Sequence, residues 1–276
     1  ITRSFIKLKT KYKIFIAKII LKLINILTNN LKFKKKINGI NWNFDLNEGI
    51  DLNLYIFKKF EFEIIKTAIK LNIRKNSSII DIGANSGIQT LQFANTFKNN
   101  IIYSVEPTDF AFNKLKLNVN LNKKLSSRIN IFQAFITNNK KKPKKVYSSW
   151  NLKSKSFHKN HYGSYKSTNF AKVFSLDNFI LNKKIKNISL IKVDVDGNEL
   201  YVFKSAKNTL KKKIPIIMEL APYLYKENNY SLEDLVNLLK SFNYSFFEMT
   251  SLDKIDNIYD YALNIPNGSS KNIIIK

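Results

Sequence analysis

The chain has 276 residues, of which 44% are hydrophobic and 13% aromatic, so it is long enough for one large α/β domain and too apolar to be disordered. It contains no cysteine and only two histidines, His158 and His161, which excludes disulfides, thiol nucleophiles, iron–sulfur clusters and multi-histidine metal sites. The formal charge of +27 rests on 47 basic residues, of which only Arg3, Arg74 and Arg128 are arginines. Because bidentate recognition of phosphate favours arginine, this charge indicates a general enrichment in lysine rather than a nucleic-acid-binding surface.

Residues 1–36 predict a basic, amphipathic helical segment that precedes the main domain. Polar residues fall on one narrow stripe of this helix, at Lys7, Lys11, Lys18, Lys22, Asn25 and Asn29. The apolar runs between the lysines are too short to span a bilayer, and no small-residue cleavage site marks a signal peptide. Two interpretations remain open: the helix lies on an anionic membrane surface, or it packs on the domain or on a second subunit. We therefore expect a cytoplasmic protein, with peripheral membrane contact under the first interpretation.

Residues 37–276 predict a single domain in which strands and helices alternate. Residues 37–60 indicate a short strand pair or a loop-rich cap, and residues 62–71 a helix. Five strands are expected at 77–83, 101–107, 129–136, 188–197 and 214–220, with helices at 87–97, 110–121, 198–210 and 231–242, a short one from residue 175, and late strands at 244–249 and 271–276. The lysine-rich stretch 138–170 has no clear period and predicts an inserted loop. This alternation predicts the α/β class, with a Rossmann-like, doubly wound, mostly parallel sheet and helices on both faces.

Acidic residues and glycines are scarce in this chain, and several of them stand where a predicted strand ends, at the edge where such sheets bind ligands. The first group is Asp81-Ile82-Gly83-Ala84-Asn85-Ser86-Gly87, in which a strand gives way to a helix. Its two glycines allow a sharp turn and a close backbone approach, but their spacing is not the G-x-G-x-x-G of a dinucleotide site. An acid at the end of this strand suits a cationic ligand such as S-adenosylmethionine. The alternative is a structural turn with a capping aspartate.

Further acids stand at the ends of the second, fourth and fifth strands. Glu106-Pro107 ends the second strand, where an acid accepts both ribose hydroxyls of an adenosine ligand. Asp194 and Asp196 alternate at the end of the fourth strand, so both are expected to face the cleft, and Glu219 at the end of the fifth strand can join them. Acids this close repel one another unless a cation or a proton is shared, so these three are also candidate ligands of a divalent metal. For Glu199 we expect the ordinary role of an acid in the first turn of a helix.

Taken in order, the runs DIGANSG, YSVEP, IKVDVDGNEL and IPIIMEL resemble the FkbM-type S-adenosylmethionine-dependent methyltransferases. The segment NWNFDLNEGIDLNLYIFKKFEFE is also similar to the one that precedes the glycine loop in that family, so the similarity covers about residues 37–276. The resemblance implies the class I methyltransferase fold and S-adenosylmethionine as cofactor, with the methionine end on the glycine loop, the ribose on the acid after the second strand and the adenine beside the third strand. The residues that it assigns to cofactor binding are Asp81, Gly83, Ala84, Asn85, Gly87, Glu106, Pro107, Gln133, Ala134 and Asp194.

The resemblance further implies methyl transfer to a hydroxyl of a glycan, a lipid-linked sugar or a small metabolite. Such a hydroxyl must lose a proton, and His158 and His161, which form His-x-x-His in the inserted loop, titrate near neutrality. Asp194 and Asp196 are the other candidate bases, or ligands of an ion that lowers the pKa of the acceptor. Two other functions remain open: a nucleic-acid methyltransferase that uses the basic surface, and a non-catalytic module that binds a membrane surface. We expect a small-molecule or glycan acceptor and no nucleic-acid partner.

Overall fold

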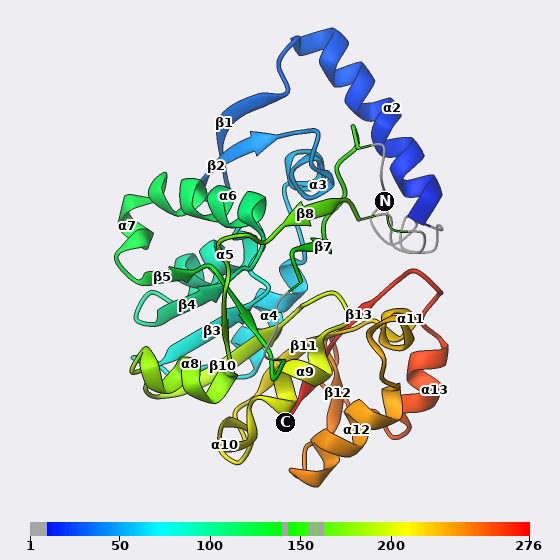
Figure 1. Ribbon diagram of the computed structural model, residues 1–276. Coiled ribbons are helices and arrows are strands. Elements are labelled where there is room, and N and C mark those ends of the chain that lie inside the picture. Colours follow the sequence, from blue (N-terminus) through cyan, green and yellow to red (C-terminus); the bar gives the residue numbers. More distant parts are fainter. Residues whose placement is uncertain (1–9, 140–142, 155–157, 159–162) are drawn as a thin grey trace.

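The computed structural model describes residues 10–139, 143–154, 158 and 163–276 (Figure 1). At the centre of this part of the chain lies a seven-stranded sheet in the order β12–β13–β11–β10–β3–β4–β5. Neighbouring strands are parallel, except that β13 runs antiparallel to both β11 and β12. The strands are β3 (Ser78–Ile82), β4 (Ile101–Val105), β5 (Ile129–Phe132), β10 (Ile188–Val193), β11 (Ile216–Leu220), β12 (Phe246–Glu248) and β13 (Lys271–Ile275). The predicted mostly parallel, doubly wound sheet is confirmed.

The direction in which the chain adds strands reverses beside β3. The chain adds β4 and β5 on one side of β3, and then crosses to the other side to add β10 and β11. Connections that leave in opposite directions open a crevice outside the carboxyl ends of the two central strands, and open α/β sheets bind ligands there. The ends of β3 and β10 are therefore the first place to look for a site.

Helices cover both faces of the sheet, because successive residues of a strand point to opposite sides. Ile80 and Ile82 of β3 point into one hydrophobic core, and Ile79 points into the other. The first core contains α8 (Leu176–Asn182), α9 (Glu199–Lys204), α10 (Lys207–Leu210), α12 (Leu232–Ser241) and α13 (Ile258–Leu263). The second contains α2 (Thr10–Thr28), α3 (Gly49–Phe57), α4 (Phe62–Lys70), α5 (Ile88–Thr96) and α6 (Asp109–Asn120). Shorter helices are α7 (Lys123–Ser126), α11 (Pro222–Tyr225) and the 3₁₀ turn Lys226–Asn228.

Three predicted segments differ in the structure: a strand and a helix each divide in two, and a loop contains a strand pair. The strand expected over 129–136 forms β5 and β6 (Ala134–Ile136), and β6 leaves the central sheet to pair with β9 (Lys172–Phe174). The helix expected over 198–210 breaks into α9 and α10, because Asp177 accepts hydrogen bonds from the first amides of α10. The stretch predicted as an inserted loop contains an antiparallel hairpin of β7 (Lys145–Tyr147) and β8 (Tyr165–Ser167).

The helical segment predicted to reach residue 36 is shorter. Helix α2 ends at Thr28, and β1 (Lys32–Ile37) forms an antiparallel hairpin with β2 (Ile40–Asp45), so the expected strand pair begins before residue 37. The hairpin docks on α6, where the side-chain oxygens of Asn122 and Asn118 accept hydrogen bonds from the amides of Asn41 and Asn43, each at 2.9 Å. These side chains occupy part of the edge of β2 that β1 leaves open.

Candidate active site

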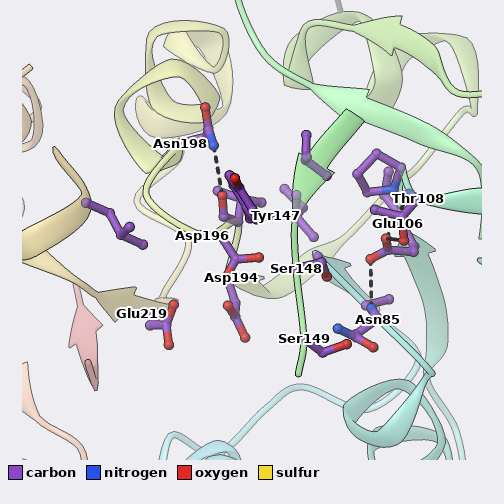
Figure 2. A pocket seen from close by; sticks show the side chains of 18 of the residues that line it. Asn85, Glu106, Thr108, Tyr147, Ser148, Ser149, Asp194, Asp196, Asn198 and Glu219 are labelled. Atoms are coloured by element: carbon purple, nitrogen blue, oxygen red, sulfur yellow. Dashed lines mark hydrogen bonds between the residues drawn. The ribbon is translucent and has the colours of Figure 1, made fainter. Parts of the chain in front are cut away.

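A cavity of about 630 Å³ lies at the carboxyl ends of β3, β4, β10 and β11. This volume falls within the range of about 300–1,000 Å³ that is usual for small-molecule sites. In Figure 2 Asp194 and Asp196 after β10 and Glu219 of β11 stand on one side of the view, and Glu106 with its neighbours stands on the other. The segment Tyr147–Ser149, which comes from the inserted stretch, runs between them. The structure thus places the cavity at the reversal point of the sheet, where the sequence predicts the site.

The loop between β3 and α5 touches the backbone that follows β10. Gly83 has a φ of +80°, and a Cβ built there would lie 1.7 Å from the carbonyl oxygen of Asp194, so only glycine fits. Gly83, Ala84 and Asn85 line the cavity, whereas Gly87 stands at the N-cap of α5. The tight turn that the sequence predicts is therefore present.

Two polar atoms at this loop have no hydrogen-bond partner among the described residues. They are Ser86 Oγ and Gln89 Oε1, both buried, and both residues line the cavity. Buried polar atoms nearly always find a partner in a native protein. This pair therefore fits a site that a polar ligand completes.

Glu106 ties the end of β4 to the glycine loop. Its carboxylate accepts hydrogen bonds from the amides of Asn85 and Thr108, both at 2.9 Å, and from the hydroxyl of Thr108 at 2.6 Å. Burial raises the pKa of Glu106, and the bonds from Thr108 and Asn85 oppose this rise. Because a carboxylate offers about four lone-pair sites, Glu106 keeps room for a ligand hydroxyl. Its predicted position at the ribose is compatible with this geometry.

The wall beside Glu106 is formed by Pro107, Ala134 and Phe135. Ala134 lies where the sequence places the adenine border, but Gln133 does not line the cavity. The amide of Gln133 is held elsewhere, because its Nε2 donates to Asp109 Oδ1 at 2.6 Å at the start of α6. The contact expected of Gln133 is therefore corrected.

Asp81 does not reach the cavity either. It is completely buried, it accepts a hydrogen bond from Thr90 at 2.7 Å, and its Oδ1 lies 3.5 Å from the ammonium of Lys192. Asp81 belongs to β3 itself, and its carboxylate is enclosed between Thr90 of α5 and Lys192 of β10 rather than open to the cavity. The direct contact with a cationic ligand that the sequence predicts is therefore wrong.

Lys192 forms ion pairs both with the buried Asp81 and with Asp194 in the wall of the cavity. Its ammonium lines the cavity, donates to the carbonyl of Gly83 at 3.2 Å and lies 3.0 Å from Asp194 Oδ2. Burial lowers the pKa of Lys192, but the charges of Asp194, Asp81 and Glu61 outweigh it and raise the pKa, so the side chain stays protonated. This cation holds the glycine loop and the residue after β10 together.

Asp194, Asp196 and Glu219 all line the cavity, and Glu61, the N-cap residue of α4, joins them. Desolvation and the negative neighbours raise the pKa of Asp196 and of Glu219 well above the usual range, and raise the pKa of Glu61 to about 7. Asp196 has a φ of +49° and lies in the loop after β10 rather than on the strand. Within the described residues no three acids or histidines converge closely enough to hold one metal ion, so these metal candidates share a cavity without forming a common centre.

Glu199 shapes the loop that carries Asp196. Its Oε1 accepts hydrogen bonds from the amides of Val195 and Gly197, at 3.3 and 3.2 Å, and its Oε2 accepts one from the hydroxyl of Tyr230 at 3.3 Å. The side chain is completely buried, and burial raises its pKa to about 7. Glu199 therefore stands in the first turn of α9, as the sequence predicts, but its carboxyl group binds the loop that precedes the helix.

The inserted stretch supplies the remaining wall and one histidine. His158 lines the cavity, its Nε2 lies 2.7 Å from Glu227 Oε2, and its ring packs edge-on against Tyr147 with centroids 4.8 Å apart. The stretch is fixed to the domain by the carbonyl of Trp150, which accepts a hydrogen bond from the amide of Gly49 at 2.8 Å. His161 lies outside the described residues.

Lys192, Glu61 and Glu227 carry much of the electrostatics of the site, and sequence reasoning assigned none of them a role. Lys192 is a lysine inside an apolar strand, which is a signal for a buried ion pair, but it does not stand out in a chain with 47 basic residues. Glu61 stands before the first strand of the sheet and Glu227 in a short turn after β11, so neither has the strand-end position that marks the other acids, and the fold brings both to the cavity.

The model of the family described as Methyltransferase FkbM domain matches residues 81–246, which is more than half of the chain. The chain belongs to the FkbM methyltransferase family. This FkbM protein is therefore an S-adenosylmethionine-dependent methyltransferase, and the expected class I methyltransferase fold is confirmed. Among curated proteins, none matches the chain.

Many solved structures show distant similarity to this FkbM protein, and two of them serve as examples. The precorrin-6y C5,15-methyltransferase from Geobacter metallireducens is 13% identical, with a TM-score of 0.44 over 79% of this chain and 87% of that one. A protein of the NADB-Rossmann superfamily from Streptococcus agalactiae is 11% identical, with a TM-score of 0.39 over 79% of this chain and 68% of that one.

Proposed function

We propose that this FkbM protein transfers a methyl group to a hydroxyl of a small metabolite, or of a sugar at the end of a glycan or a lipid-linked glycan. The observation that carries the proposal is the hydrogen-bonded pair of His158 and Glu227 in the wall of the cavity. An amine acceptor can react without a base when it is neutral, whereas a hydroxyl must lose its proton during the transfer. A histidine oriented by a carboxylate is the usual device for removing such a proton.

The residues that line the cavity are compatible with bound S-adenosylmethionine. Gly83, Ala84 and Asn85 line the cavity beside Glu106, and the orphaned atoms of Ser86 and Gln89 offer hydrogen bonds to a polar ligand. When bound, the cofactor supplies a methyl group attached to a sulfonium, which activates that group for displacement. The acidic lining favours such a cation, since desolvated carboxylates are stabilised by a positive charge nearby.

The proposed base has a carboxylate partner for the charge that it gains. When the imidazole of His158 takes the proton of the acceptor hydroxyl, Glu227, at 2.7 Å from Nε2, stabilises the imidazolium that forms. Asp196 is the second candidate base, because its raised pKa makes it a better proton acceptor than an ordinary aspartate. Asp194 is less suited, since its carboxylate is paired with Lys192.

The charge of the cavity supports a small or glycan acceptor rather than a nucleic acid. Six carboxylates of the described residues line it, from Glu61, Glu106, Asp194, Asp196, Glu219 and Glu227, with Lys192 as the accompanying lysine. The raised pKa values of Asp196 and Glu219 favour their protonated forms, but the lysine that lines the cavity among the described residues, Lys192, is already paired with Asp194 and so is a poor partner for a phosphate backbone. The net charge of the protein and the lining of its cavity therefore favour different partners, and the proposal follows the cavity.

The experiment first titrates the protein with S-adenosylhomocysteine by calorimetry. The protein is then incubated with methyl-tritiated S-adenosylmethionine and the glycan, lipid-linked-sugar, metabolite and RNA fractions of a cell extract, and the labelled product is identified by mass spectrometry. We expect an O-methyl ether in one of the first three fractions. A label on nitrogen or in the RNA fraction, or no binding of S-adenosylhomocysteine, would refute the proposal.

Variants then assign the base. We expect His158→Asn and Glu227→Gln to lower methyl transfer by about a hundredfold or more, with the affinity for S-adenosylhomocysteine unchanged within about twofold. Glu63→Gln, at an exposed glutamate outside the cavity, is the control and should transfer at the wild-type rate. If Asp196→Asn abolishes transfer while His158→Asn does not, the base is Asp196.

A further inference from the structure

Helix α2 has two apolar faces, and the domain covers only one of them. Ile14 and Leu21 are buried, and neighbouring apolar residues pack partly buried on the second core beside α3. The opposite side exposes large apolar side chains, at Tyr12, Phe15, Ile19, Leu23, Ile26 and Leu27. At 3.6 residues per turn these positions fall within one stripe about 120° wide. Figure 1 shows α2 at the margin of the molecule, away from the central sheet.

The surroundings of this exposed stripe are strongly basic. Residues 10–37 contain eight lysines and no acid within 28 residues, against a net charge of +27 over all 276 residues. Lys18 and Lys22 are exposed on α2 beside the stripe, and the lysines of the adjoining β1 are exposed as well. This local density goes beyond the lysine enrichment of the whole chain, so composition alone does not account for it.

An apolar stripe bordered by ammonium groups matches the surface of an anionic bilayer. The apolar side chains can enter the boundary of the acyl region while the lysines remain at the phosphates. A second copy of the chain is less suited, because an isologous contact through this helix would bring two sets of lysines together. Among the described residues, no helix combines the length and apolar character needed to cross a membrane, so the fitting geometry is one that lies on the surface.

We propose that α2 docks the protein on the surface of a bilayer that contains anionic lipids, with Leu23 and Leu27 in the acyl boundary and Lys18 and Lys22 at the headgroups. The neighbouring helix α3 contributes Ile50 to the wall of the cavity, so docking brings that wall close to the lipid surface. The proposal stands independently of the acceptor that the cavity takes.

The test is flotation of the full chain with vesicles of phosphatidylcholine, with and without phosphatidylglycerol. We expect binding to the anionic vesicles and about thirtyfold weaker binding to the neutral ones, if two lysines contribute about 1 kcal/mol each. The double variant Leu23→Glu/Leu27→Glu should bind anionic vesicles about thirtyfold more weakly or worse, because these side chains are 55% and 83% exposed and lose their apolar burial. The matched control is Leu181→Glu/Leu263→Glu, which adds the same charge at positions 73% and 83% exposed on α8 and α13, and should bind within about threefold of wild type.

Three results would overturn the proposal. The first is equal binding by the two double variants, and the second is no binding of the wild-type chain to anionic vesicles. The third is a dimer by light scattering that Leu23→Glu/Leu27→Glu converts to a monomer, since that outcome assigns the stripe to a second copy. Circular dichroism of both variants shows whether each remains folded, and the exposure of all four positions predicts wild-type spectra.

Discussion

Replacing Gly83 by alanine tests whether the contact between the glycine loop and the backbone after β10 builds the cofactor site. The added Cβ would stand 1.7 Å from the carbonyl oxygen of Asp194, whereas real Cβ atoms essentially never approach closer than 3.0 Å, so the two segments must separate by at least 1.3 Å. Alanine at a φ of +80° adds a conformational cost of about 1–2 kcal/mol. Since a displacement of about 1 Å in a site can cost about a hundredfold, we expect a loss of that order in the affinity for S-adenosylhomocysteine.

Gly39→Ala is the matched control for this change. Gly39 has a φ of +82°, but the nearest heavy atom to its added Cβ is Asn95 Nδ2 at 3.9 Å, so it has the conformational cost without the clash. Calorimetry with S-adenosylhomocysteine and thermal unfolding by circular dichroism measure the two effects separately. We expect Gly39→Ala to lower the Tm by a few degrees and leave the affinity unchanged, and Gly83→Ala to lower both. Equal affinities and equal Tm losses for the two variants would refute the reasoning.

Two further predictions concern buried charges. Asp81→Asn removes one partner of a buried ion pair with Lys192, so we expect it to lower the free energy of unfolding, measured in urea, by about 3–5 kcal/mol. The control is Glu63→Gln at an exposed pair, which should lower this free energy by less than about 0.5 kcal/mol. Similar losses for the two variants would contradict the role given to the buried pair. Glu199→Gln replaces a carboxyl group whose pKa in the folded wild type is raised to about 7 from an ordinary value of 4.5. The protonated carboxyl therefore stabilises the wild type at low pH, and this stability is lost as the pH rises through 7. We therefore expect the variant to gain about 3 kcal/mol relative to wild type between about pH 4.5 and 7, and a difference independent of pH in urea titrations would exclude this account.

The order of strands and helices was readable from the sequence because strands buried on both faces appear as short apolar runs closed by glycine or an acid. The run ISLIKVDVDG predicts β10, and SSIIDIG predicts β3, each to within a few residues. The run INIFQAFI hides the change of partner from the central sheet to β9, because both halves are apolar. The strands β7 and β8 are short and rich in lysine, tyrosine and serine, so they lack the alternation that reveals a strand.

Site residues were predicted correctly where their place at the end of a strand determines whether they line the cavity. They were missed where the pairing of neighbouring strands determines their contacts. Glu106 and Asp194 follow the ends of their strands, and both line the cavity. Asp81 lies two residues earlier in its strand, inside β3, where it stands opposite Lys192 of β10 in the parallel register. That register is fixed by the packing of whole strands, so the buried pair and the true role of Asp81 become visible only when the sheet is assembled.

The docking of the β1–β2 hairpin has a consequence for how the chain behaves at high concentration. One edge of the hairpin is occupied by the side chains of Asn118 and Asn122, and the other carries exposed lysines along β1. Edges that are covered or charged in this way resist pairing with a strand from another molecule, which is the usual first step toward ordered aggregates. Crowded chains are therefore not expected to associate by adding strands to the N-terminal hairpin, because neither of its edges is both open and uncharged.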